Sequence, residues 1–196
     1  MAAPIDFSAC ATLEDCFAVK RFHQSLNKHE SLRDTALSKY ATGCKVVKEL
    51  GVFQGVTFGR FLSLDGVEEV VGVDISFDIY RSSIKDIIDS YAEENKKKVT
   101  MLEMSSTDIN SVSPCDFLHI DSVHNPQHLL SELALHASSV SSRIAFHDVN
   151  QNGRALFKVV AMFVGEFQPY TWEIIEDYDQ GKCGFTVIER KRKLSE

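Results

Sequence analysis

The fold of this chain is decided by residues 46–76, which read VVKELGVFQGVTFGRFLSLDGVEEVVGVDIS. The stretch begins with five residues that are rich in β-branched side chains and too few for a core helix, which is typical of a buried strand. Apolar residues then follow with helical spacing from Val56 to Leu64, and a second apolar run ends at Asp74. The stretch therefore predicts a strand, a glycine turn, a helix and a second strand, which make a βαβ half-unit.

Gly51 and Gly55 lie in the predicted turn at the carboxyl edge of the sheet, where glycine lets the backbone approach a ligand closely. Asp74 follows Gly51 by 23 residues and is placed to accept hydrogen bonds from ribose hydroxyls. We therefore expect a nucleoside-containing cofactor, with a purely structural turn as the alternative. Neither G-x-G-x-x-G nor G-x-x-x-x-G-K-[ST] occurs here, so NAD, FAD, ATP and GTP are disfavoured.

The pattern E-x-G-x-x-x-G at residues 49–55, joined to the strand-final Asp74, resembles the class I S-adenosylmethionine-dependent methyltransferases. The resemblance implies a Rossmann-like α/β fold, with a seven-stranded, mostly parallel sheet, an antiparallel last strand and helices on both faces. It also implies S-adenosylmethionine as the cofactor. The residues that the resemblance assigns to cofactor binding are Glu49, Gly51, Gln54, Gly55, Thr57, Asp74, Ser105, Ser106 and Asp121.

A second informative stretch covers residues 116–150, which hold DFLHIDSVHNPQH and, at the end of the next predicted strand, HDVN. If the sheet is parallel, both strands end at the same edge as the glycine turn, so Asp121, His124, His147 and Asp148 should converge beside the cofactor. Two carboxylates with histidines nearby suit Mg²⁺ or another hard divalent ion. Such an ion could hold two neighbouring hydroxyls of an acceptor, while His124 takes up the proton.

The D-x-x-H step from Asp121 to His124 and the later His147-Asp148 pair are similar to the metal-dependent sugar and macrolide O-methyltransferases. They are also similar to a wider group that includes proteins named cephalosporin hydroxylases by similarity. Carried over by position, Asp121 and Asp148 would bind the ion and His124 would be the catalytic base. His147 stands where those enzymes more often have an acid, and we include it as a metal ligand.

The function that we expect is S-adenosylmethionine-dependent methylation of a hydroxyl on a small molecule, a sugar or a polyhydroxylated metabolite, with divalent-metal assistance. Two alternatives stay open. RNA ribose methylation fits less well, because no lysine of a K-D-K-E set stands at the strand end that holds His147. A non-catalytic cofactor-binding or scaffold domain would keep Gly51 and Asp74 for the fold alone.

Length and composition favour a single domain, because the chain has 196 residues and is 44% hydrophobic. A net charge of −7 argues against nucleic acid and anionic membranes as partners and favours a small neutral or cationic acceptor. The five cysteines are scattered and form no C-x-x-C pair, and the amino terminus lacks signal-peptide features. We therefore expect a cytoplasmic protein without a membrane span. Its oligomeric state stays open, a homo-oligomer included.

The domain organisation that we predict is an N-terminal helical cap segment over residues 1–43, a methyltransferase domain over 44–190 and a basic tail over 191–196. Beyond the opening stretch, helices are expected as a pair over 12–42, over 83–91, from Asn125 and over 154–164. Strands are expected over 99–104, 117–120 and 143–146, with an antiparallel pair over 172–175 and 185–189 at the sheet edge.

Overall fold

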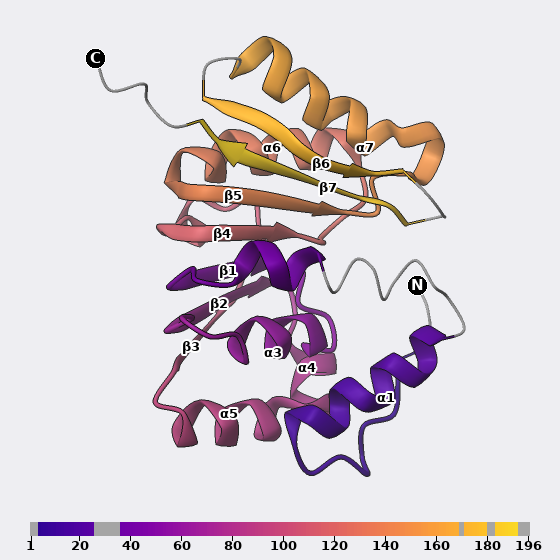
Figure 1. Ribbon diagram of the computed structural model, residues 1–196, viewed down its shortest axis with the longest axis vertical. Coiled ribbons are helices and arrows are strands. Elements are labelled where there is room, and N and C mark those ends of the chain that lie inside the picture. Colours follow the sequence, from indigo (N-terminus) through magenta and orange to yellow (C-terminus); the bar gives the residue numbers. More distant parts are fainter. Residues whose placement is uncertain (1–3, 26–35, 169–170, 180–182, 192–196) are drawn as a thin grey trace.

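A computed structural model describes residues 4–25, 36–168, 171–179 and 183–191. One sheet of seven strands has the order β3-β2-β1-β4-β5-β7-β6 (Figure 1). The first five strands in the chain pair in parallel, whereas β7 runs antiparallel to both of its neighbours. The strands are β1 (Val46–Leu50), β2 (Glu69–Asp74), β3 (Lys98–Glu103), β4 (Cys115–Ile120), β5 (Val140–His147), β6 (Trp172–Tyr178) and β7 (Phe185–Arg190). The predicted fold class is confirmed.

Helices cover both faces of the sheet (Figure 1). Residues 36–41 are also helical. The helices are α1 (Leu13–Ser25), α3 (Val56–Leu62), α4 (Asp78–Ser83), α5 (Lys85–Glu94), α6 (Pro126–His136) and α7 (Gln151–Met162), with short turns η1 (Ile109–Ser111), η2 (Ala137–Ser139) and η3 (Phe163–Phe167). None of the helices in the described ranges has the length and apolarity that crossing a bilayer requires.

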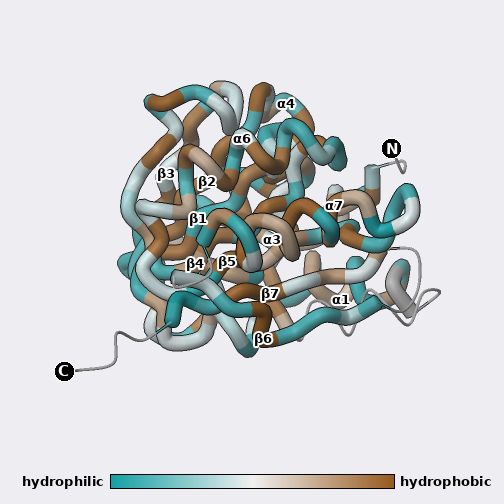
Figure 2. The backbone as a smooth tube through the Cα atoms, turned by 90° about the horizontal axis from the view of Figure 1, so that it is seen from above, coloured by the Kyte–Doolittle hydropathy of each residue, from teal (hydrophilic) through white to brown (hydrophobic). Residues whose placement is uncertain are grey.

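Two hydrophobic cores form because side chains alternate between the faces of each strand. Phe117 in β4 belongs to the core under α1, α3 and α5, whereas its neighbour Leu118 belongs to the core under α6 and α7. In β1, Val47 and Leu50 divide in the same way. Figure 2 shows the most hydrophobic stretches where strands cross the middle of the molecule. Polar side chains in the central strands, such as Lys48, Glu49 and His119, are buried, whereas Ser141 in β5 and Glu173 in β6 are exposed.

Some predicted boundaries were wrong. The helix expected over 83–91 is α5, which begins at Lys85; the short helix α4 before it was not predicted, and the chain breaks between the two at the buried Ile84 (φ −128°). β5 begins at Val140 rather than Arg143. The final strands are antiparallel as predicted, but β7 lies between β5 and β6, so β6 is the edge strand of this pair. The first turn of α7 is left-handed from Asn152 to Arg154, which explains why helical spacing was recognised only from Arg154.

The N-terminal segment packs on the sheet rather than forming a separate body. Phe7, Leu13 and Phe17 join the core that α3 closes with Phe58 and Phe61. The first predicted helix is confirmed as α1, and helical residues end at 41, before Gly43 as predicted. The expected start of the second helix near Ser31 and most of the basic tail lie outside the described residues.

Candidate functional site

The parallel strands end level with one another at their carboxyl ends. In the sheet register, the last residue of β1 lies opposite the penultimate residue of β2 on one side and the last residue of β4 on the other. The last residue of β4 in turn lies opposite the penultimate residue of β5. The next residues therefore form one row along the rim, in the order Glu103, Asp74, Gly51, Asp121 and His147. Two strand spacings put the backbones of Asp74 and Asp121 roughly 10 Å apart. The prediction that both aspartates and the glycine turn share one rim is confirmed.

Gly51 and Gly55 are required by the packing of the chain itself. Gly51 has a φ of +87°, and a Cβ atom there would lie 2.4 Å from the carbonyl oxygen of Asp121. Gly55 has a φ of +84°, and its Cβ would lie 2.5 Å from the ring of the buried Tyr80. The sequence interpretation assigned both glycines to the approach of a cofactor. The structure adds that the loop after β4 and the helix α4 approach these glycines directly.

Asp74 holds the glycine loop in place. Its Oδ2 accepts hydrogen bonds from the backbone N–H groups of Val52 (2.8 Å) and Phe53 (3.1 Å), and its Oδ1 accepts one from Ser76 (3.3 Å). A carboxylate offers about four acceptor positions, so capacity for a ligand hydroxyl remains. Asp74 is therefore both a structural residue of the loop and a candidate ribose ligand.

Large apolar side chains are exposed just after three neighbouring strands. They are Phe53 after β1, Ile75 after β2 and Val123 after β4, and Ile75 is 78% exposed. Single exposed apolar residues are common on protein surfaces, but here each follows a strand that contributes to the same rim. An apolar ligand surface, such as the face of a purine, would cover side chains of this kind.

Glu49 is placed in the core rather than at the rim. It lies opposite His119 in the register of β1 and β4, and Nδ1 of the imidazole and Oε1 of Glu49 share a hydrogen bond of 2.8 Å. Both residues are almost completely buried. Burial raises the pKa of Glu49, although His119 acts in the opposite direction. Its second oxygen, Oε2, has no partner among the described residues.

Gln54 and Thr57 bind the N-terminal part of the chain. The Gln54 amide pairs with the backbone of Ile5 in both directions, at 2.9 and 2.8 Å. Thr57 accepts a hydrogen bond of 3.1 Å from Lys20. A cavity of about 350 Å³ beside the first contact is lined by residues 4–8, Gln54 and α4, and not by the rim aspartates. These two predicted cofactor residues thus have partners within the chain.

Ser105 and Ser106 follow β3 at the same edge of the sheet. The Ser105 hydroxyl lies 2.8 Å from that of Thr107, and the Ser106 hydroxyl lies 3.1 Å from Nε2 of His128 in α6. Ser106 is buried, and its carbonyl accepts a hydrogen bond of 2.7 Å from Nε2 of His136. Of the two serines assigned to cofactor binding, Ser105 is therefore half-buried and Ser106 is buried against α6.

Asp121, His124, His147 and Asp148 form a closed group of side chains, which we call the rim cluster. Nδ1 of His147 lies 2.5 Å from Oδ1 of Asp121, and Nε2 of His124 lies 3.3 Å from the same oxygen. The other nitrogen of each imidazole faces Asp148: His124 Nδ1 is 3.2 Å from Oδ2 and His147 Nε2 is 3.2 Å from Oδ1. The predicted convergence of these four residues is confirmed.

The charges in the rim cluster shift two pKa values in opposite directions. Burial works against ionisation of Asp121, but the charge of His147 and the hydrogen bonds from both histidines hold the pKa of Asp121 well below its ordinary value. The hydrogen bond to Asp121 raises the pKa of His124, against the effect of burial and with help from Asp148. Asp121 is therefore ionised at neutral pH, and His124 is more protonated than a free histidine.

Two further residues at the cluster were not identified from the sequence. Gln151 donates a hydrogen bond of 2.5 Å from its amide to Oδ2 of Asp148. Cys183, in the loop before β7, places its sulfur within 4.8 Å of ligand atoms of His147 and Asp148. No sequence pattern marked Gln151 as a site residue, apart from its position directly after the HDVN stretch. Cys183 depends on β7 pairing with β5, which no local pattern predicts.

Comparison with solved structures shows the fold of S-adenosylmethionine-dependent methyltransferases. An O-methyltransferase of Bacillus cereus in complex with SAH has a TM-score of 0.58 and 16% identity, covering 82% of this chain and 81% of that one. The ribosomal protein L11 methylase of Lactobacillus delbrueckii subsp. bulgaricus gives 0.58 and 16%, covering 82% and 79%. An rRNA methylase of Streptococcus thermophilus gives 0.58 and 9%, covering 82% and 95%. The three names describe different acceptors, so the fold does not select one.

Comparison of sequences gives two short matches. The chain is 32% identical over 101 residues to trigger factor of Borrelia duttonii (strain Ly), and 32% identical over 103 residues to that of Borrelia recurrentis (strain A1). Each match covers 52% of this chain, which spans about a fifth (21%) of the length of these curated relatives. No family model matches the chain.

Proposed function

We propose that the chain is an S-adenosylmethionine-dependent methyltransferase that acts on a hydroxyl of a small molecule. The observation that carries the proposal is the level row of strand ends, with Asp74 on one side of Gly51 and Asp121 on the other. A nucleoside held at Asp74 would direct the rest of the donor along the rim towards Asp121. The donor and the acceptor would then meet between the two aspartates.

The residues of the rim fit the donor. The carboxylate of Asp74 keeps acceptor capacity for ribose hydroxyls, and the exposed Ile75 next to it offers an apolar surface for the base. Ser105, on the neighbouring strand end, adds a hydroxyl within the same rim. Each contact uses a side chain that the structure leaves half-buried or exposed at the carboxyl edge, where α/β sheets bind ligands.

The rim cluster fits the acceptor. Methyl transfer breaks the bond between sulfur and the methyl carbon, forms a carbon–oxygen bond and releases the hydroxyl proton. An ionised carboxylate flanked by two imidazoles can receive that proton and pass it to solvent. His124 is the member of the cluster that is most exposed, at 33% of its side chain, so an acceptor can reach it. Positioning of the two reactants supplies the rest of the rate enhancement.

A small neutral or cationic acceptor is favoured over RNA, because the chain carries a net charge of −7 and phosphate binding depends on basic side chains. RNA remains an outcome that the test must include, since rRNA methylases share the fold. A domain that binds the donor without transferring the methyl group is the second outcome.

A screen for transfer of tritiated methyl groups tests the proposal. The wild-type protein is incubated with labelled donor and with a panel of sugars, other polyols and total RNA, with and without chelator. We expect incorporation into a polyol by the wild type and by Asp86→Asn, an exposed control on α5, and loss of at least about 100-fold in Asp121→Asn, a magnitude typical for a group that stabilises the transition state. Incorporation into RNA alone, or unchanged transfer by Asp121→Asn, would refute the proposal.

A further inference from the structure

We infer that the rim cluster binds a first-row transition-metal ion through Asp121, His124 and His147, while Asp148 orients both imidazoles. This differs from the site for Mg²⁺ or another hard divalent ion expected from the sequence, in which Asp121, His147 and Asp148 were the ligands and His124 was the base. The role of the ion in catalysis rests on the proposed function, but its binding does not.

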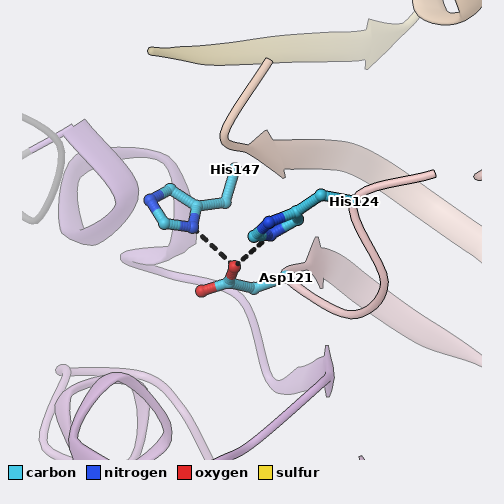
Figure 3. Close-up of side chains that lie close together, drawn as sticks. All are labelled: Asp121, His124 and His147. Carbon is cyan, nitrogen blue, oxygen red and sulfur yellow. Dashed lines mark hydrogen bonds and ion pairs between the residues drawn. The ribbon is translucent and has the colours of Figure 1, made fainter. Parts of the chain in front are cut away.

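Three ligand atoms face one point. Figure 3 shows both imidazoles directed at the same oxygen of Asp121, with separations of 2.5 Å to His147 Nδ1 and 3.3 Å to His124 Nε2. The ligand atoms of the three residues all lie within 4.8 Å of one another. Ligands held about 2.0–2.2 Å from an ion are spaced roughly 3.0–3.4 Å apart. The His124 contact already has that spacing, and the His147 contact needs to widen by about half an ångström.

Asp148 provides the outer carboxylate that metal-binding histidines require. A ligating imidazole almost always donates its other N–H to a carboxylate or carbonyl, which fixes the tautomer. Here both remaining nitrogens face Asp148, one on each of its oxygens and each at 3.2 Å. A single carboxylate therefore sets the orientation of both ligands, from a position that a φ of +55° at Asp148 creates just after β5.

The buried state of Asp148 is an independent indication of a ligand. Its side chain is only 9% exposed, yet its Oδ1 has no aligned hydrogen-bond donor among the described residues. If an ion binds His147 at Nδ1, the proton of that imidazole must reside on Nε2, which faces this oxygen. Ion binding at Nδ1 would thus place a proton 3.2 Å from this buried acceptor, whose unsatisfied state costs free energy, and a rotation of the ring would align the two.

The ligand set selects the class of ion. Two imidazoles and one carboxylate are typical of Fe²⁺, Zn²⁺ and related ions, whereas Mg²⁺ prefers oxygen ligands throughout. The more exposed side of the site is formed by Asp121 and His124, so the remaining coordination positions face the acceptor. When bound, such an ion would polarise the acceptor hydroxyl and lower its pKa, so that the proton would be lost to solvent rather than to Asp121.

Metal titration of the chelator-treated 196-residue chain tests the inference. Binding of Co²⁺ is followed by its visible absorption, and binding of Zn²⁺, Mn²⁺ and Mg²⁺ by calorimetry. We expect Mg²⁺ to bind at least about 100-fold more weakly than Co²⁺ or Zn²⁺, because it disfavours imidazole. His124→Ala and His147→Ala should each lose the Co²⁺ absorption bands, whereas Asp148→Asn should weaken binding by about 10–100-fold, as outer residues do. His23 is exposed on α1, and the control variant His23→Ala should bind the ions as the wild type does.

Three results would overturn the inference: Mg²⁺ binding as tightly as Co²⁺, unchanged Co²⁺ bands in His124→Ala, or no binding of any of the four ions. Circular dichroism of each variant shows whether it is folded. If an alanine variant is unfolded, the double variant His124→Gln/His147→Gln is measured in its place. SAH binding is measured on the same samples. Ion binding without SAH binding would refute the proposed function alone, and SAH binding without ion binding would refute this inference alone.

Discussion

At the scale of single residues, Gly51, Gly55 and the four polar side chains of the rim cluster decide what the rim can do. The sequence predicted their convergence because strand-final residues of a parallel sheet meet at one edge. It did not predict their contacts. Glu49 was assigned to the cofactor, yet period-two alternation along β1 turns it into the core beside His119. The spacing of residues in the sequence predicts the position of a residue within its strand. It does not predict the partner of that residue, which lies on another strand.

Gly51 tests whether packing, in addition to backbone conformation, requires glycine. Gly51→Ala places a methyl group 2.4 Å from the Asp121 carbonyl at a φ of +87°, whereas Gly43→Ala has a similar φ of +83° and no atom within 4 Å. We expect Gly43→Ala to lower the free energy of unfolding by about 1–2 kcal/mol, the cost of left-handed backbone. Gly51→Ala should cost at least about 1 kcal/mol more, since well-packed sites resist added groups. Urea unfolding measures both, and equal losses would mean that the loop after β4 moves aside freely.

At the scale of elements, buried polar side chains fix the loops that form the rim. His136 at the end of α6 donates a hydrogen bond to the carbonyl of Ser106 and lies 3.4 Å from the hydroxyl of Ser111. The amine of Lys48 in β1 also donates to the carbonyl of Ser111. These contacts connect β1, α6 and the loop after β3. The sequence predicted the elements themselves but not the contacts of His136, because a histidine in a helix gives no sign of its partner.

Protonation of His136 lowers the free energy of unfolding at acid pH. Burial lowers the pKa of His136 to about 4, although the bond to Ser106 acts in the opposite direction. The unfolded chain takes up this proton near pH 6.5, whereas the folded chain takes it up only near pH 4, so stability falls as the pH drops between these values. The full effect is of the order of 3 kcal/mol. Urea unfolding between pH 4 and 7 should show a smaller loss on acidification in His136→Gln than in the wild type. Parallel pH profiles would contradict a neutral buried His136.

At the scale of the whole molecule, the strand order places the residues of the proposed donor and acceptor sites on one edge of the sheet. The order β3-β2-β1-β4-β5-β7-β6 brings Asp74 and Asp121 to either side of β1, although they are 47 residues apart in the chain. The sequence predicted seven strands and an antiparallel ending from two short motifs and their resemblance to a family. It could not predict the insertion of β7 beside β5, because that pairing is set by tertiary contacts between segments with no distinguishing local pattern.

The central claim is that donor binding belongs to Asp74 and chemistry to Asp121. Calorimetric titration of the folded protein with S-adenosylhomocysteine tests it most directly, in the wild type, Asp74→Asn, Asp121→Asn and the exposed control Asp86→Asn. We predict that Asp74→Asn weakens binding at least about tenfold, the effect of losing a charged hydrogen bond, while Asp121→Asn and Asp86→Asn stay close to the wild type. Absence of binding by the wild type, or equal losses in Asp74→Asn and Asp121→Asn, would contradict this account.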